Sequence, residues 1–292
     1  MIMKDFYLLT TEHLENGLWF RDDSDFKVAM NYVAIQAACC PDVDILAFIL
    51  MSNHVHFVLF GSNEDVCRFA EIFKGRYSRY YGNKYGVKAF LRRNKVDVKL
   101  VEYEYDSWER VIAYVQMNCV AANICAHPSQ YQWGTGNLFF TQTRPSGKPL
   151  DEMSARARQR LLHSNNEDLP LNWLVLEDGY IDPRSYVNKE MVETMFRTPR
   201  RMNYYLISSS KAKKKIEAAE DNLPSFRDQT ILNILPELCR SLFQKDSFEY
   251  LTETEQSEFA RQIRFRFSSD ANQIARVCGI TYSKAARLLD SI

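Results

Sequence analysis

The 292-residue sequence has no long hydrophobic run, no C-x-x-C spacing and no net charge. No stretch reaches the roughly 18 apolar residues that a membrane helix needs, and Lys4 followed at once by Asp5 does not resemble the start of a signal peptide. The seven cysteines are odd in number and two of them are adjacent, which indicates neither a disulfide framework nor a zinc knuckle. We therefore expect a cytoplasmic protein without a membrane partner, whose thiols are reduced and mostly buried.

The net charge is zero, but Lys and Arg are concentrated in two segments of the sequence. Between Lys74 and Lys99, nine cations stand against one acid, and four tyrosines are interleaved with them. The second run, Arg197–Lys215, has seven cations and no acid. Either run can be a solvated helix surface, but interleaved rings favour single-stranded nucleic acid, whose bases stack on rings while cations follow the phosphates. The candidate DNA contacts in the first run are Lys74, Arg76, Arg79, Lys84, Arg92, Arg93 and Lys95.

The first 125 residues alternate strand and helix patterns. We predict strands at 6–11, 43–51, 54–60 and 96–105, and helices at 25–39, 64–81 and 107–125. Ser52–Asn53 makes a tight turn between the second and third strands, and Asp106–Ser107 supplies capping residues for the last helix. The order β-α-β-β-α-β, followed by a helix, predicts an α+β protein with a ferredoxin-like antiparallel sheet and helices on one face.

The character of the sequence changes after Trp133, where glycines at 134, 136 and 147 fall among polar residues and indicate a linker or exposed loop. We predict a domain at 1–145, a linker and accessory segment of unassigned role at 146–225, and a helical domain at 226–292. The spacing Thr252-x-x-Glu255 is that of a capping box, and it should open a helix that ends near Phe267.

Residues 271–289 resemble a helix-turn-helix, with two short helices at 271–278 and 283–290. Gly279 permits the sharp turn between them. A plain helical hairpin in a bundle would show the same pattern, but nearby cations favour duplex DNA, with the second helix in the major groove. The candidate contacts are Arg276, Lys284 and Arg287.

One strand and one helix carry the residues suited to chemistry. Strand positions i and i+2 face the same way, so His54 and His56 project together as a ready metal chelate. In the helix 107–125, Tyr114 and Asn118 lie one turn apart at the flank of the apolar stripe. Each feature alone is also common in ordinary protein cores, where histidines are satisfied by hydrogen bonds and tyrosines pack as aromatic residues.

Four segments taken together resemble a known family. Residues 48–59 contain the His-Val-His motif, 73–81 a basic helix, 114–122 a tyrosine helix and 131–134 the turn Tyr-Gln-Trp-Gly. In this order they resemble the single-tyrosine HUH transposases, which include small insertion-sequence transposases and the REP-associated tyrosine transposases. The resemblance spans about the first 140 residues. Cys119 stands where the family usually has Pro, and Asn123 replaces a small Gly that is common further on.

This resemblance implies a transposase-type DNA strand transferase. His54 and His56 would be metal ligands, Asn118 a third ligand of amide type, and Tyr114 the nucleophile that becomes joined to the 5′ phosphate of single-stranded or hairpin DNA. Mixed nitrogen and oxygen ligands suit Mg²⁺ or Mn²⁺ when substrate oxygens complete the shell. The phosphotyrosine bond would retain the energy of the phosphodiester, so a second 3′ hydroxyl can rejoin strands without ATP. The family includes dimers, which leaves a homodimer open.

Two other functions remain compatible with the sequence. The first is a catalytically silent chromosomal DNA-binding protein that keeps the HUH fold; the changes at Cys119 and Asn123 motivate it, and it predicts DNA binding without a covalent adduct. The second is a metal-dependent hydrolase acting on another substrate, for which Tyr114 would be dispensable.

Overall fold

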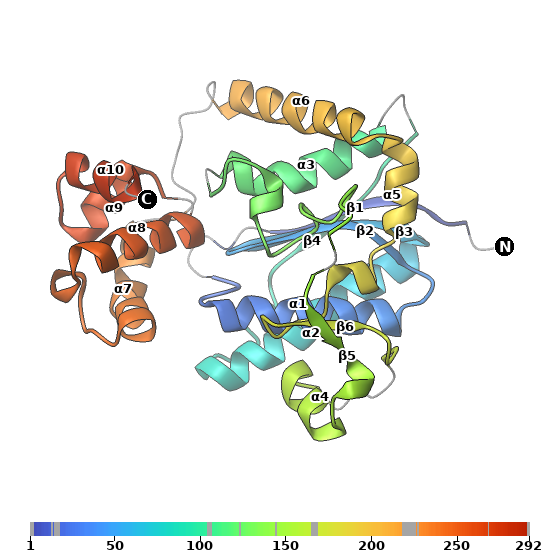
Figure 1. The fold of residues 1–292 in the computed structure, drawn as a ribbon, viewed down its shortest axis with the longest axis horizontal. Helices are drawn as coiled ribbons and strands as arrows, with labels where there is room; N and C mark the ends of the chain where they lie inside the picture. Colours follow the sequence, from blue (N-terminus) through green and yellow to red (C-terminus); the bar gives the residue numbers. More distant parts are fainter. Residues whose placement is uncertain are drawn as a thin grey trace.

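A four-stranded antiparallel sheet lies at the centre of the N-terminal part (Figure 1). The computed structural model describes residues 3–12, 14, 18–103, 107–122, 124–143, 145–164, 169–217, 226, 228–267 and 269–290. The strand order is β2-β3-β1-β4, and every neighbouring pair is antiparallel. The strands are β1 (Asp5–Thr11), β2 (Asp44–Met51), β3 (His54–Gly61) and β4 (Val96–Leu100). The predicted α+β class and the predicted order of these elements are confirmed.

The turn between β2 and β3 fixes the face of the sheet on which the histidines lie. Met51 pairs with His54, so Ser52 and Asn53 alone connect the two strands. Side chains alternate along a strand, and a slip of one residue would turn both histidines to the other face. The same register pairs His56 with Thr10 of β1.

Helices cover both faces of the sheet, so the expectation of helices on one face is wrong. The helices are α1 (Asp23–Cys39), α2 (Asn63–Tyr85) and α3 (Ser107–Ala121). The Phe57 ring contacts Phe69 and Phe73 of α2 on one face. On the opposite face, Trp108 of α3 stacks on Phe6 at 3.9 Å between ring centroids. Figure 1 shows α3 on one side of the sheet and α1 and α2 on the other. The apolar side chains of β1 and β3 on that face require a second covering layer.

Backbone from residues 133–135 covers the outer edge of β2. Leu50 N donates to Trp133 O at 2.8 Å, and Thr135 N donates to Phe48 O at 3.0 Å. Gly134 is needed there because a Cβ would meet Phe48 O at 2.7 Å. The expectation of a linker after Trp133 is therefore wrong for these buried residues, since the glycine serves close backbone approach and an edge strand is protected.

The segment after residue 146 packs into the same hydrophobic core as the sheet. Its elements are β5 (Gly147–Pro149), α4 (Ala155–Leu162), β6 (Leu174–Leu176), α5 (Lys189–Phe196) and α6 (Pro199–Glu217). Buried Asn31 of α1 holds the segment through hydrogen bonds to Leu161 O, Gly179 O and Ile181 N. The helix α6 packs along α3 on the side away from the sheet (Figure 1).

The C-terminal helices surround a second core (Figure 1). They are α7 (Asp228–Phe243), α8 (Glu253–Phe267), α9 (Ala271–Cys278) and α10 (Tyr282–Asp290). The capping box is confirmed, because Thr252 N donates to Glu255 Oε2 and Glu255 N donates to Thr252 Oγ1. Gly279 ends α9 at φ +66°, which gives the predicted short hairpin of helices.

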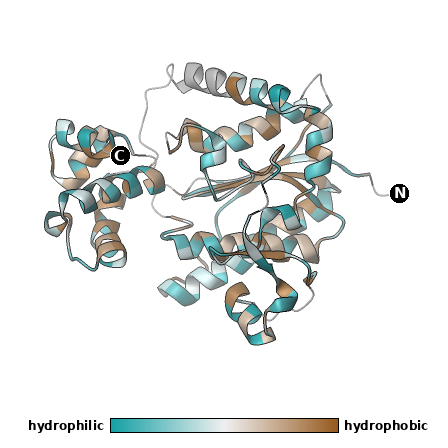
Figure 2. Cartoon of the chain, viewed as in Figure 1, coloured by the Kyte–Doolittle hydropathy of each residue, from teal (hydrophilic) through white to brown (hydrophobic). Residues whose placement is uncertain are grey.

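Hydrophobic residues line the strands and the inner sides of the helices (Figure 2). None of the helices in the described ranges is both long and apolar enough to cross a membrane. All seven cysteines are free thiols, but only three of them, Cys119, Cys239 and Cys278, are buried. The expectation of mostly buried thiols is therefore wrong, and Cys39 and Cys67 lie at the surface.

Candidate functional site

His54 and His56 lie side by side on β3, as the strand spacing predicted. Their ring centroids are 4.8 Å apart and the rings are nearly perpendicular, at 88°. Both side chains are buried, with 5% and 2% of their surfaces exposed. A neighbouring oxygen engages Nδ1 of each ring: Asn53 Oδ1 lies 2.7 Å from His54 Nδ1, and Thr10 Oγ1 lies 2.9 Å from His56 Nδ1. Contacts of this kind orient imidazoles and leave Nε2 as the ligand atom.

Tyr114 reaches the histidines from α3. Its ring meets His56 edge-on, with 5.7 Å between centroids and 77° between ring planes. The tyrosine is also 36% exposed, so a ligand can approach it from solvent. Partial burial raises the pKa of the Tyr114 hydroxyl above 10, and the positive charge of Lys99 opposes this rise. At neutral pH the group is therefore a phenol and must lose its proton before it can act as a nucleophile.

Asn118 lies one turn after Tyr114 on α3 and is buried. Its amide nitrogen donates to Tyr114 O at 2.9 Å and to Val115 O at 3.3 Å. These bonds direct the nitrogen back along the helix, so the amide oxygen is the atom that could act as a ligand. The neighbouring change at Cys119 is accommodated, because its thiol donates to Gln116 O within the helix. Asn123 lies outside the described residues.

Three residues of the site were not among the sequence candidates. Thr10 and Asn53 orient the imidazoles, and Lys99 acts on the Tyr114 pKa. The strand register explains Lys99, because Leu8 pairs with both Val58 and Lys99 and these three side chains share the face of His56. Only the pairing of distant strands reveals this, although the sequence predicted an alternating strand at 96–105, of which the structure has β4 at Val96–Leu100.

The donor set suits a divalent ion held by two imidazoles. Among the described residues, no group of three His, Cys, Asp or Glu gathers around any point. Further ligands would therefore have to come from Asn118 and from the oxygens of a substrate. That combination is the open type of coordination expected of a catalytic ion, since substrate must occupy part of the shell.

The basic run at 74–99 lies partly on the other side of the sheet. Arg76, Arg79 and Lys84 of α2 line an open cleft of about 740 Å³ with Tyr32, Tyr80 and His163, on the α1–α2 face. Burial and the charge of Lys84 lower the pKa of His163, so this ring is neutral at pH 7. The cleft and Tyr114 are on opposite faces of the sheet.

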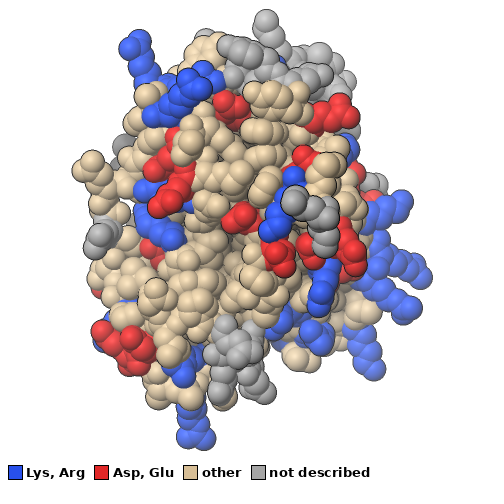
Figure 3. Space-filling model, turned by 90° about the vertical axis from the view of Figure 1, so that its right-hand side faces the viewer, with Lys and Arg blue, Asp and Glu red and all other residues tan. Residues whose placement is uncertain are grey.

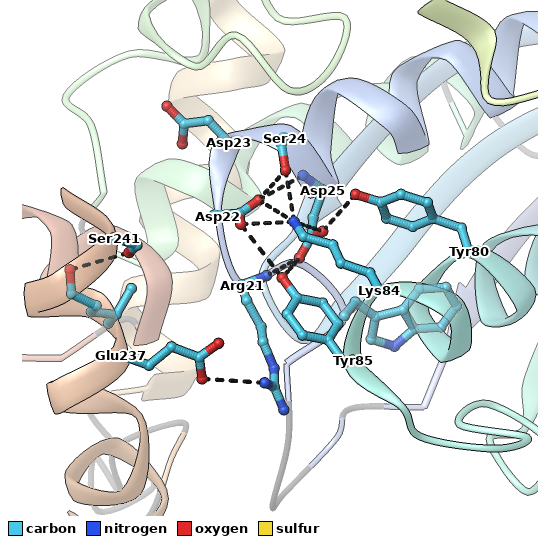
Figure 4. Close-up of polar contacts among 12 residues, drawn as sticks. Arg21, Asp22, Asp23, Ser24, Asp25, Tyr80, Lys84, Tyr85, Glu237 and Ser241 are labelled. Atoms are coloured by element: carbon cyan, nitrogen blue, oxygen red, sulfur yellow. Dashed lines mark hydrogen bonds and ion pairs between the residues drawn. The ribbon is translucent and has the colours of Figure 1, made fainter. Parts of the chain in front are cut away.

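Lys84 has a structural role that the sequence did not reveal (Figure 4). Its ammonium donates to Asp22, Ser24 and Asp25, each at 2.7 Å. Asp25 is fully buried and also accepts from the hydroxyls of Tyr80 and Tyr85. Burial and the charge of Asp25 raise the pKa of Tyr80 to about 12. Because its charge is neutralised within the chain, Lys84 is a weak candidate for DNA contact.

The other predicted DNA contacts include cations that are paired or buried within the chain and cations that project into solvent. Lys74 is buried and donates to Asn94 O, and Arg276 and Arg287 pair with Asp228 and Glu253. Cations that project from the surface are better placed for phosphates; they include Arg79, Arg92, Arg93 and Lys95, while Lys284 is half-buried. Figure 3 shows Lys and Arg side chains gathered along one edge of the face that it draws. Of the second run, the side chains of 210–217 lie outside the description.

No protein-family model and no curated protein matches the sequence. A solved structure described as the REP-associated tyrosine transposase bound to a REP hairpin is similar at 12% sequence identity, over 47% of this chain and 80% of that chain. The TM-score is 0.33. A likeness at this level establishes no function for this chain.

Proposed function

We propose that the chain is a metal-dependent DNA strand transferase of the single-tyrosine HUH type, with Tyr114 as its nucleophile. One observation carries the proposal: two buried imidazoles lie against each other on β3, and the ring of Tyr114 lies against one of them. The histidines are buried and lie 60 and 58 positions before Tyr114 in the sequence, whereas the Tyr114 side chain is 36% exposed. The resemblance of the four sequence segments supports the same function.

The chemistry of the chain follows from this arrangement. The Tyr114 phenol releases its proton to solvent, and its oxygen attacks the phosphorus of a single-stranded DNA phosphate. The new bond joins tyrosine to the 5′ phosphate, while the bond to the 3′ oxygen breaks and that oxygen takes up a proton. His54 and His56, with Asn118, would hold Mg²⁺ or Mn²⁺, which when bound supplies charge withdrawal from the phosphate. Attack by another 3′ hydroxyl reverses the step and rejoins strands.

A labelled single strand tests the proposal. With Mn²⁺ and an oligonucleotide labelled at its 3′ end, the label should move onto the protein, while a 5′ label should remain on a released fragment with a free 3′ hydroxyl. Tyr114→Phe should reduce the adduct to below detection, because the attacking oxygen is gone. Tyr103→Phe is the matched control, since Tyr103 is 77% exposed and packs on Trp108 instead. An adduct that persists in Tyr114→Phe would refute the assignment.

The raised pKa of Tyr114 favours a second candidate, the catalytically silent DNA-binding protein, because a protonated phenol is a poor nucleophile. This candidate predicts that DNA binds with or without metal and that no adduct forms under any metal. Binding measured in parallel with adduct formation distinguishes the two functions.

A further inference from the structure

We propose that the cleft on the α1–α2 face is a binding site for a phosphate group, separate from the site at Tyr114. Its volume of about 740 Å³ falls in the range of small-molecule pockets, roughly 300–1,000 Å³. From α2, the side chains of Arg76, Arg79 and Asn83 line the cleft at helical spacing, and His163 lines it just after α4. Because Arg79, Asn83 and His163 are exposed, a ligand can reach them from solvent.

Arg76 and Arg79 supply positive charge that no acidic side chain of the described residues neutralises. Neither guanidinium forms a salt bridge among those residues, and the lining of the cleft includes no Asp or Glu. Lys84 also lines the cleft, but Asp22 and Asp25 hold its ammonium at 2.7 Å. The charge available to an anionic ligand therefore comes from the two arginines.

The two arginines act on the same part of the cleft. Burial raises the pKa of the Tyr32 hydroxyl, and the positive charges of Arg76 and Arg79 both oppose this rise. Arg76 is oriented by a hydrogen bond from Nη1 to Ser164 Oγ at 3.3 Å, whereas Arg79 projects into solvent. Two guanidinium groups near one point are suited to a single anion that can engage both of them.

A phosphate group fits these donors better than a carboxylate does. It offers at least three acceptor oxygens, which is enough for two guanidinium groups and the exposed amide of Asn83, whereas a carboxylate has only two oxygens. The neutral ring of His163 can add one further N–H donor without adding charge. The cleft therefore matches a phosphate both in charge and in the number of donors.

The phosphate can belong to a free phosphate compound or to a DNA strand, because the same donors recognise both. The inference goes beyond strand transfer and does not depend on it, since the cleft and Tyr114 lie on opposite faces of the sheet. If the phosphate comes from DNA, the cleft holds the strand at a distance from the phosphate that reacts.

Calorimetric titration of the full chain without divalent metal tests the site. Inorganic phosphate and deoxyadenosine monophosphate should each bind saturably, whereas deoxyadenosine, which lacks the phosphate, should not. Acetate at the same concentration should not displace deoxyadenosine monophosphate, because it has too few acceptor oxygens. The site would be overturned by equal binding of deoxyadenosine, by equal competition from acetate, or by the absence of saturable binding of both phosphate compounds.

Two substitutions assign the binding to the cleft. Arg79→Met keeps the length of the side chain but removes the guanidinium, so the Kd of deoxyadenosine monophosphate should weaken about tenfold. Arg240→Met, at an exposed arginine of α7, is the control. Asn83→Asp places a negative charge beside the phosphate with almost no change in shape, and should weaken binding about threefold or more. Asn203→Asp adds the same charge on α6 and should bind as the wild type does.

Melting temperatures of the four variants establish that each is folded, and because Asn83→Asp changes so little it guards against misfolding of Arg79→Met. An unchanged Kd in both cleft variants, or an equal loss in the two controls, would refute the assignment to the cleft.

A single-stranded oligonucleotide identifies the source of the phosphate. Displacement of deoxyadenosine monophosphate by the oligonucleotide supports a cleft that holds DNA, and retention supports a cleft for free phosphate compounds. Tyr114→Phe should bind deoxyadenosine monophosphate as the wild type does. Phosphate binding without a covalent adduct in the wild type would refute strand transfer alone, and an adduct without phosphate binding would refute the cleft site alone.

Discussion

Tyr114 combines two properties that oppose each other. Contact with His56 requires its ring to be partly buried, and burial raises the pKa of the hydroxyl. The reactive phenolate is therefore a minor species at neutral pH. Lys99 is the charged neighbour that lowers this pKa, although its own ammonium is exposed and also pairs with Asp97 at 3.0 Å.

The pH dependence of adduct formation should reflect these opposite effects of burial and Lys99 on the Tyr114 pKa. Because the Tyr114 pKa lies above 10, the rate should rise about tenfold per pH unit across pH 6–8 if deprotonation of the phenol limits it. Lys99→Met raises the Tyr114 pKa further and lowers the rate at a given pH, by about twofold for each 0.3 unit of pKa. Lys88→Met, at an exposed lysine outside the site, is the control. A profile of Lys99→Met that coincides with the wild type would contradict the role of Lys99.

The edge of β2 shows how an element far from the chemistry positions the site. Because β2 and β3 form one hairpin, whatever fixes β2 also fixes the strand that carries both histidines. The backbone of residues 133–135 supplies the missing hydrogen bonds of β2, and Gly134 lets the two segments approach. The turn that follows the tyrosine helix thereby ties that helix to the histidine hairpin.

Alanine substitutions at Gly134 and Gly75 should distinguish a glycine that is needed for close backbone contact from one that only adds backbone flexibility. Gly134→Ala places a methyl group 2.7 Å from Phe48 O and should lower the free energy of unfolding by about 1–3 kcal/mol. Gly75→Ala, in the interior of α2 with nothing within 4 Å of the added Cβ, should raise it by about 0.5–1 kcal/mol. Chemical denaturation of both variants measures the difference. Equal effects would mean that the edge contact of Gly134 contributes nothing.

At the scale of the whole molecule, the chain has two hydrophobic cores, and one buried cation connects them. Arg266 of α8 is 1% exposed and donates to Arg21 O at 2.6 Å and to Asp23 at 3.3 Å, at the start of α1. The neighbouring Phe265 ring packs on Phe26 and Tyr131. The C-terminal helices are thus held against the part that carries the site.

Loss of Arg266 should weaken this connection. Arg266→Ala leaves Arg21 O without its donor and should lower the free energy of unfolding by about 1–3 kcal/mol. Arg240→Ala removes an exposed ion pair with Asp246 and should cost less than about 1 kcal/mol. Thermal unfolding by calorimetry compares them, and two separated transitions in Arg266→Ala would show that the cores unfold independently. Equal destabilisation by both substitutions would argue against a connecting role of Arg266.

The sequence by itself determined the order of strands and helices in the first 125 residues and the pairs of residues that lie together within one element. Alternation along β3 placed His54 and His56 together, and helical spacing placed Tyr114 and Asn118 on one side of α3. The spacing of Thr252 and Glu255 predicted the start of α8. These are local consequences of backbone geometry, which is why the sequence alone was sufficient to predict them.

Only the tertiary structure decided what each element packs against. The second helical layer, the closed edge at Gly134 and the neutralised Lys84 all depend on residues distant in sequence. No local pattern distinguishes a lysine that faces solvent from one bound to a buried carboxylate. The physical reason is that burial and partnership are properties of contacts between elements, whereas periodicity is a property of one element alone.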